Sequence, residues 1–320
     1  MPVHRAVVSF SMRNLFRQCV LLLAVVLTQV VVSSASAQDR DNPTPPRSSV
    51  NTCLVCHNNP AITGIRQTVH GQTSIPGSPF ARGGCTECHG PSENHLRSMQ
   101  SPSVVFDDGT QLFAPSPIAV QNQSCLNCHQ TRERLHWSGS EHQNADLACI
   151  SCHKIHSGAP GALRPAGMPD ICLSCHLEKR AQFASRTHHP VPEGLMTCTN
   201  CHNPHGSDAP SLLSKSSVVE TCTQCHTEKR GPFLWEHQPV TEDCTTCHNP
   251  HGTTQASLLS VRQPFLCQGC HSDVFHPSTL YSGTGAPPAG AAQQLLGAAC
   301  TNCHSAVHGS NHPSGSRLTR

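Results

Sequence analysis

Aromatic side chains are scarce in this sequence, since nine Phe, two Trp and one Tyr make up only 4% of its 320 residues. Charged side chains are also few, at 12%, against roughly 25% in an ordinary soluble domain. Proline and glycine are spread throughout, with 26 and 22 copies. The chain therefore has few large side chains for a conventional hydrophobic core, and something other than side-chain packing must hold it together.

Long hydrophobic runs are missing too, except near the start of the chain. The run at 19–32 is apolar apart from Thr28 and Gln29, and it is shorter than the roughly 20 residues that a membrane-spanning helix needs. Three arginines precede it at positions 5, 13 and 17, and small residues at 35–37 follow it. This order is typical of a secretory signal rather than a membrane anchor. We therefore expect a signal peptide at 1–37 and an extended N-terminal segment at 38–50.

An excess of positive charge is also absent. Removing the signal takes three of the 21 basic residues and none of the 19 acidic ones, so 18 basic residues remain and the formal charge is −1. Proteins that bind nucleic acid need a basic surface to meet the phosphate backbone. We therefore expect no nucleic-acid partner.

Cysteine and histidine, in contrast, are abundant, with 21 and 24 copies. The motif Cys-x-x-Cys-His occurs ten times and uses every cysteine except Cys19, which lies in the expected signal. A single Cys-x-x-Cys also fits a zinc site or a redox dithiol, but ten copies that all end in His predict covalent c-type haem attachment, with ten haem c groups. The motif cysteines are Cys53, Cys56, Cys85, Cys88, Cys125, Cys128, Cys149, Cys152, Cys172, Cys175, Cys198, Cys201, Cys222, Cys225, Cys244, Cys247, Cys267, Cys270, Cys300 and Cys303.

The histidine of each motif is expected to be the proximal iron ligand of its haem. These ligands are His57, His89, His129, His153, His176, His202, His226, His248, His271 and His304. Thirteen further histidines follow residue 37, whereas only Met99, Met168 and Met196 could offer a thioether. We therefore predict bis-histidine ligation, which gives lower potentials than Met/His ligation. With both axial positions filled, the irons would carry electrons, and we expect no enzyme activity.

The ten motifs form five successive pairs, an internal repetition that indicates a repeated architecture. Each pair has a spacer histidine between its motifs and a trailing histidine after them, and these are the candidate distal ligands. The spacer histidines are His70, His142, His189, His237 and His276, and the trailing histidines are His95, His156, His205, His251 and His308. Three trailing histidines lie only three residues after a proximal one, too close to reach the same iron easily, so we expect them to bind a neighbouring haem. His136, His188 and His312 are surplus, although His312 also competes with His308 for the last position.

The expected fold is a multihaem cytochrome c, mostly coil with short α-helices and little or no β-structure. The motifs divide it into an N-terminal haem-binding half at 51–196 and a C-terminal half at 197–320, with five haems each. Glu and Lys favour short helices at 174–184 and 223–229, and the long intervals 91–124 and 277–299 are expected to be loops. Because haem rings replace the missing aromatic core, folding should depend on haem attachment.

Several segments go beyond a generic multihaem pattern. They are EKRGP at 228–232, LWEH at 234–237, PVTE at 239–242, CTTCHNPH at 244–251 and VHGSNHPSG at 307–315. Together with NAD at 144–146 and the ten motifs, these segments resemble the MtrA/DmsE family of periplasmic decahaem cytochromes over essentially the whole mature chain. The resemblance implies an elongated, entirely bis-histidine haem wire in the periplasm, inserted into an outer-membrane β-barrel porin. It also implies electron exchange with periplasmic carriers and often an extracellular multihaem cytochrome at the outer end.

Three functions compete at this point. The first is a conduit that links periplasmic carriers to extracellular metal oxides, sulfoxides or Fe(II), in either direction. The second is a soluble periplasmic shuttle that donates electrons to a terminal reductase, which needs the same haems but no barrel. The third is a multihaem reductase, which needs an open iron or an altered motif such as Cys-x-x-Cys-Lys, and every motif here ends in His. The resemblance favours the conduit.

Overall fold

The computed structural model describes residues 50–107, 109, 112–157, 164–271, 299–313 and 315–320. These residues belong to one compact unit, Ser49–Arg320. The expected signal peptide, nearly all of the segment 38–50, and His276 lie outside the described residues. Within the described ranges, no helix combines the length and the apolar character that spanning a membrane requires.

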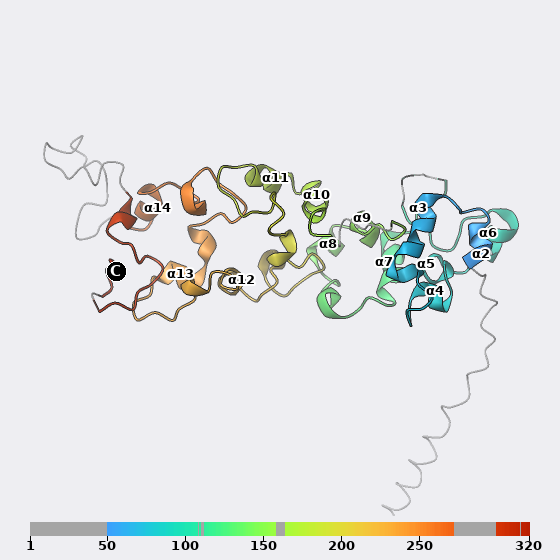
Figure 1. Ribbon diagram of the computed structural model, residues 1–320, viewed down its shortest axis with the longest axis horizontal. Helices are drawn as coiled ribbons and strands as arrows, with labels where there is room; N and C mark the ends of the chain where they lie inside the picture. The colour runs from blue at the N-terminus through green and yellow to red at the C-terminus, as the bar shows by residue number, and fades with distance from the viewer. Residues whose placement is uncertain (1–49, 108, 110–111, 158–163, 272–298, 314) are drawn as a thin grey trace, which may run out of the picture. The chain divides into compact units, whose positions relative to one another are not determined.

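Short helices joined by irregular segments make up the described chain (Figure 1). The α-helices are α2 (Val50–Leu54), α3 (Pro60–Thr63), α4 (Pro79–Arg82), α5 (Thr86–His89), α6 (Glu93–Ser98), α7 (Ile118–Leu126), α8 (Glu141–Asn144), α9 (Cys149–Cys152), α10 (Met168–Leu173), α11 (Leu177–Phe183), α12 (Val218–Cys222), α13 (Gln238–Glu242) and α14 (Phe265–Gln268). The 3-10 helices are η1 (Gly64–Gln67), η2 (Val69–Gly71), η3 (Arg132–Arg134), η5 (Cys198–Asn200), η6 (Pro210–Leu212), η7 (Thr227–Lys229), η8 (Cys244–Thr246), η9 (Ala256–Leu258) and η11 (Cys300–Asn302).

Extended pairing is limited to isolated antiparallel bridges in the part of the chain that the structure describes. They join Thr187 to Thr253, His202 to Leu213, Trp235 to Ser310 and His248 to Leu259. No strand is formed among these residues, which confirms the expected class of mostly coil with short helices.

Helix positions follow the sequence expectations only in part. The helix predicted at 174–184 is present as α11, whereas the one predicted at 223–229 is reduced to η7. The interval 91–124 was expected to be a loop and instead contains α6 and most of α7. Glu93 favours the first turn of α6, and Pro117 directly precedes α7, so local signals for helix starts outweighed the Pro- and Ser-rich composition.

The side-chain core is small. Among the described residues the buried apolar side chains are Trp137, Phe183, Val191, Ala209 and Leu212, and no large side chain is less than 2% exposed. The polypeptide alone therefore removes little apolar surface from water, and that burial is the main favourable term in folding.

Candidate haem centres

All ten motifs adopt the same turn. In each one, the backbone N–H of the histidine donates to the carbonyl of the first cysteine, at 2.9–3.1 Å. The turn spans both cysteines and the histidine, so the local backbone brings the two sulfurs and the ring of one motif into a single neighbourhood. Its spacing suits two thioether bonds and one axial ligand from the same short segment.

Cysteine contacts join the motifs in chain order. Within each pair, the first cysteines of the two motifs interact, as Cys53 with Cys85, Cys125 with Cys149, Cys172 with Cys198, Cys222 with Cys244, and Cys267 with Cys300. Between pairs, the charge of a second cysteine raises the pKa of the second cysteine of the preceding pair, after the larger effect of burial, as Cys128 does for Cys88, Cys175 for Cys152, Cys225 for Cys201, and Cys270 for Cys247. These alternating interactions relate every motif to the next one along the sequence.

The cysteine pKa values record the same proximity. Burial raises the pKa of the Cys85 thiol to about 11, with Cys53 as the next cause. The hydrogen bond from Cys172 lowers the pKa of Cys198 to about 7. A thioether sulfur no longer titrates, so for an attached haem these shifts matter only as evidence that the sulfurs lie close together.

Histidine rings pair across the motifs. Each histidine–histidine ring pair in the described ranges combines one motif histidine with one spacer or trailing histidine, and the centroids are 5.9–6.2 Å apart. The nine pairs are His57–His95, His89–His156, His129–His70, His153–His205, His176–His142, His202–His251, His226–His189, His248–His308 and His271–His237.

The separation of these rings fits an iron atom between them. Metal–imidazole bonds of roughly 2 Å on both sides would put the two ring centroids about 6 Å apart. The centroid separations of rings in direct contact would vary more widely, because those of aromatic pairs in proteins spread over about 4.5–7 Å. The residues present therefore fit haem with two histidine ligands, and each donor set is chemically suited to low-spin iron.

Most ring pairs join histidines that belong to successive motif pairs, and they follow a regular pattern. A spacer histidine meets the first motif histidine of the next pair, as His142 meets His176. A trailing histidine meets the second motif histidine of the previous pair, as His205 meets His153. The first pair has no predecessor, and there the trailing His95 meets His57 of its own pair.

Backbone carbonyls orient many of these rings, and also that of the motif histidine His304, through Nδ1. The bonds are His89 to Val104 at 3.2 Å, His95 to Gln100 at 2.7 Å, His142 to Pro204 at 2.7 Å, His189 to Pro250 at 2.7 Å, His202 to Ser211 at 2.8 Å, His248 to Ser257 at 2.8 Å, and His304 to Arg317 at 2.6 Å. A carbonyl accepts only from a protonated Nδ1, so Nε2 keeps its lone pair for a metal.

One turn that supplies such a carbonyl occurs twice. Ser211 has φ 54° and the following leucine φ 56°, and Ser257 and its following leucine have φ 55° and 56°. Positive φ is uncommon for residues with a side chain. In both copies the serine carbonyl accepts from the proximal ring, His202 or His248, at 2.8 Å. The repeated letters SLLS at 211–214 and 257–260 are the sequence signal for these positioning residues, which ligand counting alone overlooks.

Burial keeps several paired rings neutral. It is the largest cause that lowers the pKa of His89, His153 and His205. For His251, burial followed by the charge of Lys179 lowers the pKa to about 4. A neutral imidazole is the form that binds a metal.

The surplus histidines behave differently from the ligand candidates. His188 donates from Nδ1 to the Ser185 carbonyl at 2.7 Å and from Nε2 to the Glu193 carboxylate at 3.0 Å, and the Glu193 hydrogen bond raises its pKa. His136 belongs to no ring pair among the described residues, whereas His308 pairs with His248. The geometry thus places His308, an expected distal histidine, against a motif histidine.

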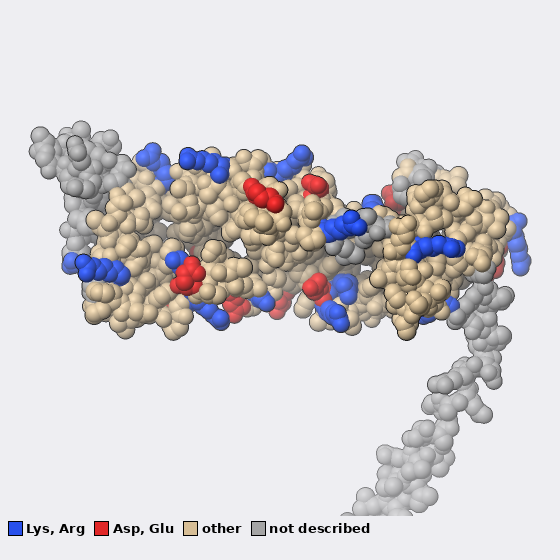
Figure 2. Space-filling model, in the orientation of Figure 1, with Lys and Arg blue, Asp and Glu red and all other residues tan. Residues whose placement is uncertain are grey.

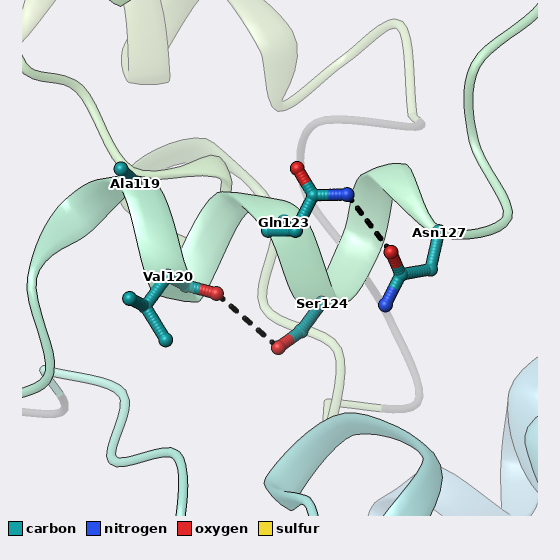
Figure 3. Close-up of a pocket in the computed structure, with 5 residues that line it drawn as sticks. All are labelled: Ala119, Val120, Gln123, Ser124 and Asn127. Atoms are coloured by element: carbon teal, nitrogen blue, oxygen red, sulfur yellow. Dashed lines mark hydrogen bonds between the residues drawn. The ribbon is translucent and has the colours of Figure 1, made fainter.

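A shallow hollow lies along the exposed side of α7, where the third motif begins (Figure 3). Its lining residues are Ala119, Val120, Gln123, Ser124 and Asn127. Gln123 donates to Asn127 at 2.8 Å and Ser124 to the Val120 carbonyl at 3.4 Å (Figure 3). These side chains are bonded within the helix, so the hollow offers little for recognising a ligand.

Comparisons with known proteins agree with this geometry. The family model "Doubled CXXCH motif" matches residues 188–231 and 237–276, and the model "Cytochrome c-type protein NrfB-like" matches 85–164. The chain is 40% identical to "Multiheme cytochrome MtrA" of Shewanella baltica (strain OS185) over 273 residues, which cover 84% of this chain and 81% of that protein.

Proposed function

The chain belongs to the MtrA family of multihaem c-type cytochromes, which transfer electrons, and we propose that it is a decahaem conduit across the outer membrane. In this proposal it lies inside a β-barrel porin and links periplasmic electron carriers with extracellular donors or acceptors such as Fe(II), metal oxides or sulfoxides. The observation that carries the proposal is the series of nine ring pairs with a common spacing near 6 Å.

The ligand set of this proposal has ten iron sites. Each motif supplies two thioether sulfurs and the proximal histidine, and each ring pair supplies the distal histidine. His304 completes the set with His276, the spacer histidine left over once the nine pairs are formed. Haem bound there supplies a one-electron iron couple, and the chain's own residues fix its axial ligands, attachment and surroundings.

Electron carriage, rather than catalysis, follows from the closed coordination. Two imidazoles per iron leave no axial position for a small substrate, so we propose that the protein is not an enzyme. The electrostatic effects between cysteines of consecutive motifs support a path in which electrons pass from each site to the next along the sequence.

A barrel partner is supported by the polypeptide itself. The described chain is largely irregular, and irregular backbone cannot meet lipid without leaving its hydrogen-bonding groups unsatisfied. Figure 2 shows Lys, Arg, Asp and Glu scattered over a face that is mostly uncharged. Such a surface suits a protein-lined lumen, and an extracellular multihaem cytochrome could take over electrons at its outer end. In this proposal the chain is exported to the periplasm by its signal peptide.

The test of the conduit is to solubilise outer membranes after a high-salt wash and stain for covalent haem. We expect this chain to purify with a β-barrel protein in a fixed ratio. Recovery of all the protein from the soluble periplasm would reject the conduit in favour of the periplasmic shuttle, without affecting the iron ligand set.

A further inference from the structure

The spacer histidine His189 is bonded to the peptide group that precedes a trailing histidine. Its Nδ1 donates to the carbonyl of Pro250 at 2.7 Å, and Pro250 is followed directly by His251. A ring nitrogen meets a carbonyl only as an N–H donor, so the other nitrogen of His189 keeps its lone pair for iron. Two candidate distal ligands are thus joined through one hydrogen bond and one peptide group.

A backbone bridge holds the same two segments together. Thr187 lies two residues before the spacer histidine, and Thr253 lies two residues after the trailing histidine. The N–H of Thr187 donates to the carbonyl of Thr253 at 3.1 Å, and the N–H of Thr253 donates back at 2.8 Å. We call this bonded pair of segments, 187–189 and 250–253, a distal staple.

Two further pairs of segments contain one of these two kinds of contact. In one pair, the spacer ring donates to the carbonyl of the residue before the trailing histidine. In the other pair, reciprocal backbone bonds join the residue two before the spacer histidine to the residue two after the trailing one. The contacts are His142 to Pro204 at 2.7 Å, Trp235 to Ser310 at 2.9 Å and Ser310 to Trp235 at 2.9 Å. All three cases join a spacer segment to the trailing segment of the next motif pair, so the staple is a repeated feature of the fold.

The two ligands of the staple at 187–189 and 250–253 serve consecutive iron sites. The ring of His251 pairs with His202, the second motif histidine of the third pair. The ring of His189 pairs with His226, the first motif histidine of the fourth pair. The staple therefore lies at the boundary between two motif pairs, where an electron must pass from one pair to the next.

The hydrogen bond couples the two ligands in one direction. Because the His189 ring holds the Pro250 carbonyl, loss of that ring releases the backbone from which the His251 side chain starts. Replacement of the His251 side chain, in contrast, leaves the Pro250 carbonyl and its bond to His189 in place. Hydrogen bonds of this kind fix the orientation of metal ligands.

We infer that His189 positions the distal ligand of a second iron site in addition to binding its own, so that the staple fixes two consecutive haems relative to each other across a motif-pair boundary. The inference rests on the proposed haem function. It gives a spacer histidine a positioning role that ligand counting does not assign, and it holds for either direction of electron flow.

The test compares His189→Met with His251→Met in the full haem-loaded protein, by electron paramagnetic resonance of the fully oxidised state. Each variant changes one axial ligand of one site to a thioether, which can still bind iron. His189→Met also removes the bond to Pro250, so we expect two low-spin signals to move, those of the sites at His226 and His202. In His251→Met that bond is retained, and only the signal of the His202 site should move.

Full oxidation makes this a comparison of ligand geometry. Every iron is ferric in the parent and in both variants, so a second signal moves only if the ligands of that second site are displaced. The second signal moved by His189→Met should be the one that His251→Met moves. A single moved signal in His189→Met, or two moved signals in both variants, would overturn the inference.

If His189→Met loses a haem, Thr187→Pro decides instead. Proline has no N–H to donate to Thr253, while every cysteine and every iron ligand is kept, and we expect the same two signals to move. Thr187→Ala keeps the N–H and is the matched control, which should match the parent. Identical signals in Thr187→Pro and Thr187→Ala would overturn the inference. The proposed haem count fails separately, if the intact mass of the parent shows fewer than ten haems.

Discussion

At the residue scale, six of the paired histidines use their two ring nitrogens for different tasks. Where Nδ1 donates to a carbonyl, as from His142 to Pro204 or from His202 to Ser211, Nε2 is left for the metal. Pro204 directly precedes His205, and Pro250 directly precedes His251, so a bond that orients one distal ring also ties it to the next distal ligand. The carbonyls therefore fix ligand direction without a charged side chain.

His251→Met tests a single distal assignment. The haem should stay attached through Cys198 and Cys201, because its proximal ring is His202 and only the partner ring changes. A thioether ligand raises the potential of a haem that has a histidine on the other side. Potentiometric titration should show one centre moved upward, and conduction should slow if that haem is an obligatory step.

The control for this substitution is His136→Ala. The His136 ring joins no ring pair among the described residues, so the number of low-spin haems should not change. Unchanged spectra and potentials in His251→Met would exclude His251 as a ligand.

At the element scale, tight turns bring the segments of different repeats together. Gly206 and Gly252 each follow a trailing histidine and have φ values of 116° and 144°. A Cβ on either would lie 2.0 Å from a backbone carbonyl, that of His136 or that of Gln182. Glycine is required at these points because the backbone of one repeat presses directly on the next.

Gly206→Ala should destabilise the haem-loaded protein more than Gly139→Ala. Both glycines have positive φ, but nothing lies within 4 Å of a Cβ on Gly139. The change at Gly139 should therefore show only the cost of a left-handed alanine, about 1–2 kcal/mol, while Gly206→Ala adds a clash with backbone. Guanidinium unfolding followed by Soret absorbance measures the free energy of unfolding of both variants. Equal losses of this free energy would mean that the close contact at Gly206 does not affect stability.

The sequence predicted the kind of secondary structure but not which segments of different repeats contact one another. The motifs predicted the haem attachment sites, and the spacing of three residues predicted that trailing histidines serve a neighbouring haem. That His205 pairs with His153, and His142 with His176, could not be read from spacing, because these pairs form between repeats whose separation depends on turns and carbonyl contacts. The helices α6 and most of α7 were also missed, since their start signals are only one or two residues long.

At the scale of the whole molecule, the described polypeptide has little core of its own. The buried apolar side chains are few, while residues such as Val55 and Leu195 are 78% exposed. This agrees with the scarcity of aromatic side chains in the sequence. The small size of the core could be predicted from composition, whereas the spatial order of the motifs required the structure, in which cysteines of consecutive motifs affect one another's pKa.

Without haem attachment, the chain should not fold. Burial of apolar surface must offset a backbone ordering cost of roughly 1–2 kcal/mol per residue, and this small core cannot do so. After expression without the haem-attachment machinery, circular dichroism should show an unstructured chain. That chain should also be degraded rapidly in the cell. A cooperatively folded apo form would contradict this prediction.

The central claim is that this chain carries electrons through a barrel along a continuous series of iron sites. The most direct measurement uses sealed liposomes that contain a reduced viologen dye, with this protein and its co-purified barrel in the membrane. When a ferric acceptor is added outside, the account predicts rapid oxidation of the enclosed dye with both proteins present, and almost none with either protein alone. Oxidation by the barrel alone at the same rate, or no oxidation by the complete complex, would contradict it.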